Sequence, residues 1–251
     1  MSEVVVIGLG QLGRVFAGGY LRCGRTVVPA NRGNHLGVIA DAHPYPEQVL
    51  VAVGESDLAS VLGTLPMVWR DRIALIQNEL LPDAWTAHGL VDPTVMSVWF
   101  EKKPGRDPKP LIASPVAGAG AGLLIDALAS IDLPAREVAS GDALLFELVV
   151  KNVYILTTNL AGLRTGGTVA QLWANHRDFA RAVAQDVMDL QAALTGERFE
   201  PDALIAGMLA AFDGDPEHQC MGRSAPARLQ RALAHADRLH LAVPTLRTLA
   251  G

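Results

Sequence analysis

The sequence predicts an α/β protein, with an N-terminal Rossmann-type, doubly wound sheet followed by a smaller all-α C-terminal domain. Two observations predict this fold class. Up to residue 141, short β-branched apolar runs alternate with segments of helical spacing. From residue 142 onward, nearly all apolar residues recur at helical spacing. We therefore predict one domain over residues 1–141 and a second over residues 142–251.

The first thirty residues have the order of a βαβ unit. An apolar run at 3–7 predicts the first strand, the following helix ends at Cys23-Gly24, and the second strand begins at Thr26.

A glycine motif of GxGxxG spacing lies between the first strand and the helix. Such a turn brings backbone amides and a helix N-terminus to the diphosphate of a dinucleotide. The alternative is a glycine-rich turn that binds nothing. The predicted diphosphate-binding residues are Gly8, Gly10, Gln11, Leu12 and Gly13.

The end of the second strand predicts which dinucleotide is bound. NAD-specific folds place an acidic residue there to bind the ribose hydroxyls. This chain has Asn31-Arg32 at that place, and an arginine can bind a 2′-phosphate through charge-assisted hydrogen bonds. We therefore predict NADP(H) as the cofactor, with Asn31 and Arg32 among its ligands; the alternative for Arg32 is a solvated loop cation.

The remaining elements follow from the same patterns. Strands are predicted at 48–53, 73–76, 95–100 and 111–115, and helices at 56–65 and 122–130, with a charged turn at 101–110. In the second domain, helices are predicted at 146–156, 169–193, 201–212 and 225–239, with Gly196 after the second and Ser224 as N-cap of the last.

Composition limits the class of protein. The chain has 251 residues, 50% of them apolar and 19% charged, and a net charge of −5. This predicts a folded protein whose main partner is neither a nucleic acid nor a membrane. The two cysteines form neither a disulfide framework nor a zinc motif, and no metal site is predicted. A reducing compartment is the simplest interpretation, and no signal peptide is apparent, so we expect a cytoplasmic protein.

At four places the sequence resembles the ketopantoate reductase (2-dehydropantoate 2-reductase) family. They are the glycine motif with Asn31-Arg32, the strand 73–76 that leads to Asn78, the block from Glu147 to Lys151 with Asn159 eight residues later, and the C-terminal stretch 234–244. The resemblance implies an NADPH-dependent reductase of a small 2-keto acid or related carbonyl compound. The apolar helical domain could pack across the interface of a homodimer.

The resemblance also implies roles for individual residues. Lys151 would donate the proton to the carbonyl oxygen, with Asn78 and Asn159 beside substrate or cofactor and Ser224 near the substrate. From spacing alone, Lys151 could instead form an i,i+4 ion pair with Glu147. For Asn78 and Asn159, the alternatives are a turn residue and a polar residue that ends a helix.

The sequence departs from the family at several positions. Ile155 stands where the family has a second asparagine, and Gly54 stands where a lysine commonly follows the third strand. The family's Ser-Ser-Met-x-x-Asp stretch has only a weak counterpart at 219–224, and the acidic residue of the next helix has none. Two alternatives therefore stay open: a regulator or sensor that binds NADP(H) without catalysis, and an imine reductase.

Overall fold

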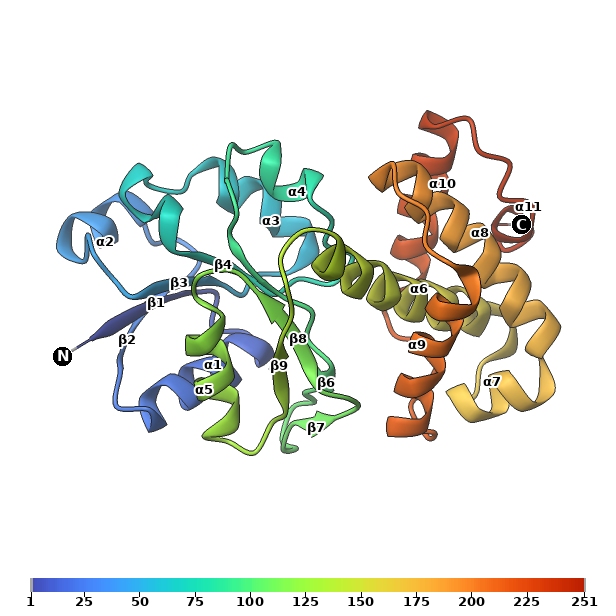
Figure 1. Cartoon of the computed structure of the whole chain (residues 1–251), viewed down its shortest axis with the longest axis horizontal. Coiled ribbons are helices and arrows are strands. Elements are labelled where there is room, and N and C mark those ends of the chain that lie inside the picture. The colour runs from blue at the N-terminus through green and yellow to red at the C-terminus, as the bar shows by residue number, and fades with distance from the viewer. Residues whose placement is uncertain (1, 251) are drawn as a thin grey trace. The chain divides into compact units, whose positions relative to one another are not determined.

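The computed structural model describes residues 2–250 and confirms the predicted fold class (Figure 1). The described residues divide into two compact units, unit 1 over residues 2–147 and unit 2 over residues 148–250. The domain boundary predicted at residue 141 lies directly before helix α6 (Asp142–Thr165), and the two units divide within that helix.

Seven strands form the main sheet of unit 1, in the order β2-β1-β3-β4-β5-β8-β9. All neighbours are parallel except β5 and β8. Because β1 lies between β2 and β3, the chain direction across the sheet reverses there, and ligands of such sheets bind at the carboxyl ends of these strands. The bounds are β1 (Glu3–Ile7), β2 (Thr26–Ala30), β3 (Gln48–Val51), β4 (Ile73–Leu75), β5 (Thr94–Met96), β8 (Ser114–Ala117) and β9 (Ala135–Glu137).

Helices cover both faces of this sheet (Figure 1). Helices α1 and α5 cover one face, where apolar side chains such as Phe16, Leu124 and Leu128 are fully buried against the strands. The helices of unit 1 are α1 (Gln11–Arg22), α2 (Leu36–Ala42), α3 (Glu55–Gly63), α4 (Asp83–Thr86) and α5 (Ala121–Ala129), with a 3₁₀ helix at Met67–Arg72. Sequence patterns missed α2, α4, the 3₁₀ helix and β9, which are all short.

The prediction for residues 95–115 was wrong in detail. The chain leaves the main sheet after β5, and β6 (Phe100–Glu101) pairs with β7 (Lys109–Pro110) in a separate antiparallel sheet. The predicted turn is therefore the inside of a hairpin. Trp99 lies between β5 and β6, outside both strands. Its amide donates to Ser114 Oγ (2.9 Å), and its carbonyl accepts from the Leu111 amide (2.8 Å). Strand β8 begins only at Ser114.

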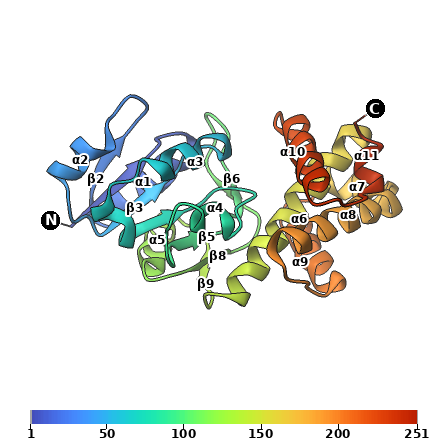
Figure 2. The same ribbon diagram turned by 90° about the horizontal axis from the view of Figure 1, so that it is seen from above.

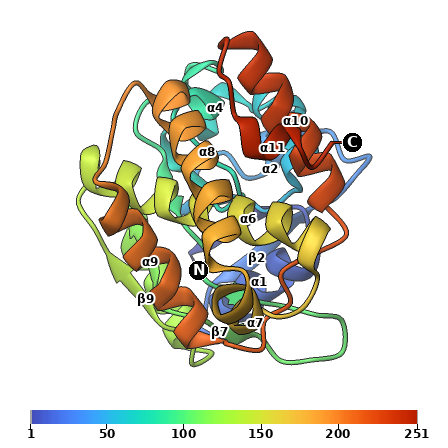
Figure 3. The ribbon, with the colours of Figure 1, turned by 90° about the vertical axis from the view of Figure 1, so that its right-hand side faces the viewer.

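Unit 2 is helical, as predicted. Its helices after α6 are α7 (Val169–Asn175), α8 (Arg177–Thr195), α9 (Pro201–Gly214), α10 (Ala225–Arg238) and α11 (Pro244–Arg247). Helices α10 and α11 lie side by side (Figure 2). In the view of Figure 3, α8 crosses α6, and a buried hydrogen bond from Asn152 Nδ2 to Gln191 Oε1 (2.8 Å) joins these two helices.

Two helix predictions in unit 2 need correction. The helix predicted at 169–193 is two helices, because His176 (φ −135°, ψ 31°) leaves the helical conformation and ends α7 while starting α8. The helix predicted at 146–156 is longer and forms α6. By length and composition α6 could cross a membrane, but 72% of its apolar window is buried in the protein, which is typical of a core helix. Gly196 (φ 76°) ends α8 as predicted.

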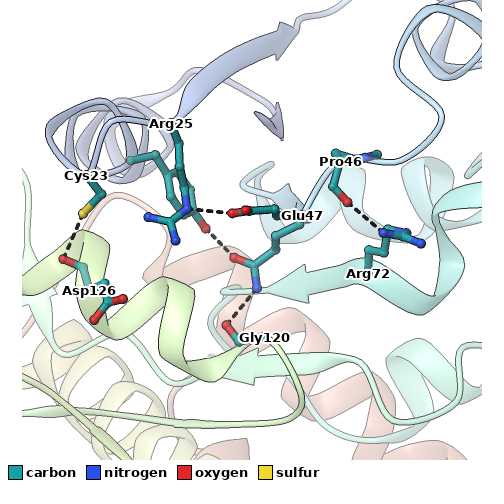
Figure 4. A network of polar contacts seen from close by, with 9 residues as sticks. Cys23, Arg25, Pro46, Glu47, Arg72, Gly120 and Asp126 are labelled. Carbon is teal, nitrogen blue, oxygen red and sulfur yellow. Dashed lines mark hydrogen bonds and ion pairs between the residues drawn. The ribbon is translucent and has the colours of Figure 1, made fainter. Parts of the chain in front are cut away.

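A buried polar network connects α1, β3 and the turn before α5 (Figure 4). The Tyr20 hydroxyl donates to Gln48 Oε1 (2.5 Å), and Gln48 Nε2 donates to the Gly120 carbonyl (3.0 Å). The Gly120 amide donates in turn to Thr94 Oγ1 (2.9 Å). Burial of the hydroxyl raises the pKa of Tyr20, so this network is uncharged at neutral pH.

Replacement of Gln48 by a side chain of similar size without polar atoms tests this network. Gln48→Met leaves the buried Tyr20 hydroxyl and the Gly120 carbonyl without their partner. We expect the free energy of unfolding to fall by about 2–4 kcal/mol, measured by urea denaturation. The double variant with Tyr20→Phe should recover about 1 kcal/mol, because one unsatisfied group is removed. A loss below about 0.5 kcal/mol would show that the network does not stabilise the fold.

Candidate functional site

The turn between β1 and α1 is built by the close approach of two glycines. Gly8 has a φ of 93°, and a Cβ atom on Gly13 would lie 2.0 Å from the Gly8 carbonyl oxygen. No larger residue fits at position 13 without displacing this turn. Arg14 Nε donates to the Leu9 carbonyl (3.0 Å) and fixes the turn from the helix side.

The turn exposes backbone to a cavity. A Cβ atom on Gly10 would meet nothing within 4 Å, and no side chain caps the N-terminus of α1 there. A helix N-terminus of this kind offers amide hydrogens and a positive dipole to an anion. The turn therefore fits the diphosphate of a dinucleotide. Gln11, Leu12 and Gly13 lie in the first turn of α1 but do not line the cavity, so their predicted contact with the diphosphate stays a prediction.

The cavity has a volume of about 710 Å³ and lies within unit 1. It extends from the glycine turn to the loop after β2 and to one side of α3. The lining residues predicted from the sequence are Gly8, Gly10, Asn31 and Arg32. Its position at the carboxyl ends of β1, β2 and β3 is where parallel sheets bind nucleotides.

Residues 31–34 form a closed four-residue turn. The Asn34 amide donates to the Asn31 carbonyl (3.0 Å), and Asn34 Oδ1 accepts from the Asn31 amide (2.8 Å). Gly33 has a φ of 87°, as the third position of a type II turn requires. The turn holds Arg32 at the mouth of the cavity, where 89% of its side chain is exposed.

The opposite wall of the cavity is one side of α3. The residues of this wall recur at helical spacing and so lie on one face of α3 and at its C-terminal end. They are Asp57, Ser60, Val61 and Thr64. Sequence reasoning missed these residues, although their spacing after a buried strand is visible in the sequence. Asp57 Oδ2 lies 2.8 Å from Arg32 Nη2, so Arg32 forms an ion pair and is not only a solvated cation.

Gln77 ties the ends of β3 and β4 together. Its Nε2 donates to the Val51 carbonyl (2.6 Å) and the Val53 carbonyl (3.3 Å), and Val53 lines the cavity. Asn78 follows it at the same edge of the sheet, in a turn, half-buried. Asn78 does not line the cavity, so its predicted role beside the cofactor stays a prediction.

Lys151 lies on α6 in unit 2 and is only 9% exposed. Burial, together with the positive charge of Arg228, lowers the pKa of Lys151 to about 7. Its Nζ lies 5.4 Å from the centre of the Tyr154 ring, where a cation–π contact stabilises the charged form. Glu147, the i,i+4 alternative, bonds to Arg136 at 2.5 Å in unit 1.

Asn159 is bound by protein groups at both ends of its amide. Its Oδ1 accepts from Arg228 Nη1 (2.8 Å), and its Nδ2 donates to the Cys220 carbonyl (3.2 Å). The amide therefore fixes the Arg228 guanidinium, itself only 9% exposed, on the side of unit 2 that holds Lys151. The predicted role of Asn159 beside substrate or cofactor stays a prediction. Arg228 was not predicted from the sequence, where it lies three residues after Ala225 on an amphipathic helix.

Ser224 occupies the N-cap position of α10, with a proline in the first turn, as predicted. Its side chain makes no capping hydrogen bond, because its backbone is helical (φ −87°, ψ −6°) and not extended. Its carbonyl accepts from the Arg228 amide (3.0 Å). Ser224 thus lies one helical turn before Arg228, and its role near a substrate stays a prediction.

Comparison with known proteins relates this geometry to solved structures. No family model matches the sequence, and no curated protein matches it. The 2-dehydropantoate 2-reductase from Methylococcus capsulatus is similar in structure, with a TM-score of 0.71 and 15% identity over 98% of this chain and 94% of that chain. The fold is that of the ketopantoate reductases. The resemblance inferred from the sequence is confirmed at the level of the fold.

Two further structures extend this comparison. The 2-dehydropantoate 2-reductase from Geobacter metallireducens GS-15 has a TM-score of 0.69 and 16% identity over 99% of this chain and 97% of that chain. A D-mandelate dehydrogenase in complex with NADH has a TM-score of 0.65 and 13% identity over 99% of this chain and 96% of that chain. Both cover nearly all of the chain, so the helical unit as well as the Rossmann unit has counterparts in this fold.

The glycine turn can be tested without any ligand. Gly13→Ala should lower the free energy of unfolding by about 2–4 kcal/mol in urea denaturation, because its Cβ would overlap the Gly8 carbonyl. Gly10→Ala should change it by less than about 1 kcal/mol, because its Cβ meets open space. Equal losses for the two variants would contradict the described packing of the turn.

Proposed function

We propose that this protein is an NADP(H)-dependent reductase of a small 2-keto acid or a related carbonyl compound. The observation that carries the proposal is the cavity, which joins a glycine turn suited to a diphosphate with a guanidinium suited to a 2′-phosphate. The solved structures of the same fold support an oxidoreductase, since they are named as 2-dehydropantoate 2-reductases and as a D-mandelate dehydrogenase with NADH.

The cofactor would be held by groups in the segments that follow strands β1, β2 and β4. The backbone at Gly8 and Gly10 and the start of α1 would bind the diphosphate, and Asn31 and Arg32 would bind the adenosine phosphate. Reduced nicotinamide supplies a hydride when it is bound. Asn78 follows strand β4, which lies beyond β3 in the sheet, and would lie toward the nicotinamide end.

Lys151 would donate the proton that the carbonyl oxygen takes up on reduction. A proton donor works best when its pKa is near the working pH, and burial brings the pKa of Lys151 to about 7. Arg228 adds a permanent positive charge next to this amine. Two buried cations suit an anionic substrate, and a 2-keto acid brings a carboxylate beside the carbonyl group. Asn159 would keep the guanidinium in place for that carboxylate.

The assembly and the location of the protein are further parts of the proposal. One structure of the same fold is named as a dimeric ketopantoate reductase from Staphylococcus aureus, which supports a homodimer. The acidic net charge supports a small-molecule substrate and not a nucleic acid or an anionic membrane as partner, and we propose a cytoplasmic location from the absence of a disulfide framework and of an apparent signal peptide. Light scattering after size-exclusion chromatography would measure the molar mass in solution.

Nucleotide binding and turnover test the proposal directly. Purified protein should bind NADPH, measured by isothermal titration calorimetry, and oxidise it with at least one member of a panel of 2-keto acids. Arg32→Gln should weaken NADPH binding at least about tenfold and leave NADH binding within about twofold, because only NADPH carries the 2′-phosphate. Binding of neither nucleotide would refute the proposal. Binding without turnover on any keto acid or cyclic imine would favour the regulator or sensor.

The pH dependence of turnover tests Lys151. Since only the protonated amine donates a proton, kcat for carbonyl reduction should be highest below pH 7 and fall as the pH rises through about 7. Lys151→Met should lower kcat at least about a hundredfold.

A second variant separates proton donation from a structural role of this region. Arg228→Gln removes a charge that lowers the pKa of Lys151, so the fall in kcat should move to higher pH. An unchanged pH profile in Arg228→Gln, from protein with a normal unfolding transition, would contradict the assignment of Lys151.

A further inference from the structure

An acidic residue lies opposite the loop arginine in the cavity. Asp57 Oδ2 is 2.8 Å from Arg32 Nη2, and both residues line the cavity with the glycine turn. Asp57 comes from α3, whereas the acidic residue typical of NAD-specific folds comes from the end of the second strand. The cavity therefore holds both an acceptor for hydroxyl groups and a donor for a phosphate.

The position of Asp57 is fixed by α3. Its amide donates to the Gly54 carbonyl (3.0 Å) as the helix begins, and a carboxylate in the first turn is stabilised by the helix dipole. Asp57 is 42% exposed in its side chain, so a bound nucleotide can reach it from the cavity. Arg32 lies on a loop, whereas Asp57 belongs to helix α3, which forms one wall of the cavity.

NADPH and NADH would interact differently with the Asp57 carboxylate. The 2′-phosphate of NADPH is a dianion near neutral pH, and it would compete with Asp57 for Arg32 while being repelled by the carboxylate. The ribose of NADH carries a hydroxyl group instead, which can donate a hydrogen bond to a carboxylate.

We infer that Asp57 is the specificity-determining residue of the nucleotide site, and that it lets the protein use NADH as well as NADPH. The inference rests on the proposed function, because it requires that the cavity bind a pyridine nucleotide. Asp57 would accept from the adenosine ribose when NADH is bound. When NADPH is bound, the ion pair between Asp57 and Arg32 would break and Arg32 would bind the phosphate instead. The loss of this ion pair would lower the affinity for NADPH.

A different role for Asp57 predicts the opposite result. If Asp57 only holds Arg32 in place for the phosphate, its loss weakens NADPH binding and leaves NADH binding unchanged. The sign of the change in NADPH affinity therefore separates a discriminating residue from a positioning residue.

The experiment compares dissociation constants of NADPH and NADH by isothermal titration calorimetry for wild type and Asp57→Asn. The asparagine keeps the size of the side chain and removes its charge. We expect the Kd for NADPH to fall roughly five- to tenfold and the Kd for NADH to rise at least about twofold. Glu55→Gln is the matched control, because it removes the same charge from the same helical turn at a position that does not line the cavity. It should leave the ratio of the two constants unchanged.

The outcomes distinguish this inference from the proposal on which it rests. Wild-type protein that binds neither nucleotide refutes both. Wild-type protein that binds NADPH, with a Kd ratio in Asp57→Asn equal to that of wild type, refutes only the inference. Weaker NADPH binding in Asp57→Asn also refutes it and assigns Asp57 to the positioning of Arg32. An equal shift in Glu55→Gln would show that the effect is one of net charge and not of this site.

Discussion

The approach of α1 to the end of β1 is the constraint on which the cavity depends. Gly13 packs so close to the Gly8 carbonyl that no side chain can lie between them. This contact brings the N-terminus of α1 close to the end of β1, and the turn between them, Gly8 to Gly10, lines the cavity. The same helix packs against α5 through Gly19, whose Cβ would lie 2.3 Å from the Ala127 carbonyl. Small residues thus set the position of α1 at both contacts.

The sequence predicted the parts of the molecule that depend on local patterns. Strand β1, the glycine turn and the parallel strands β3 and β4 are short apolar runs between turn residues, so their positions are visible without tertiary information. The hairpin β6–β7 was missed because its pairing is set by contacts of Trp99 with residues more than ten positions away. The break at His176 was missed because the apolar repeat continues through it.

In the candidate site, too, the sequence predicted the residues that a local pattern places and missed those that meet only on folding. The glycines and Arg32 were found because a motif and a strand end place them in space. Asp57 was missed because its importance comes from the proximity of α3 to the loop after β2, two segments that helix α2 and strand β3 separate in the sequence. Arg228 was missed for a similar reason, since the sequence shows an arginine on an amphipathic helix but not the charge of Lys151 near it. Pairs of residues that come together only in the folded chain can be identified from the structure but not from the sequence.

The loop that carries Arg32 is self-contained, because the bonds that close it run between Asn31 and Asn34. Neither residue contributes to the apolar core beneath the sheet. Exchanges at position 32 of this loop can therefore accumulate with little cost to folding, whereas exchanges at Gly13 in the glycine turn cannot. Among descendants of such a protein, nucleotide preference would be expected to drift quickly while the ability to hold a nucleotide persists.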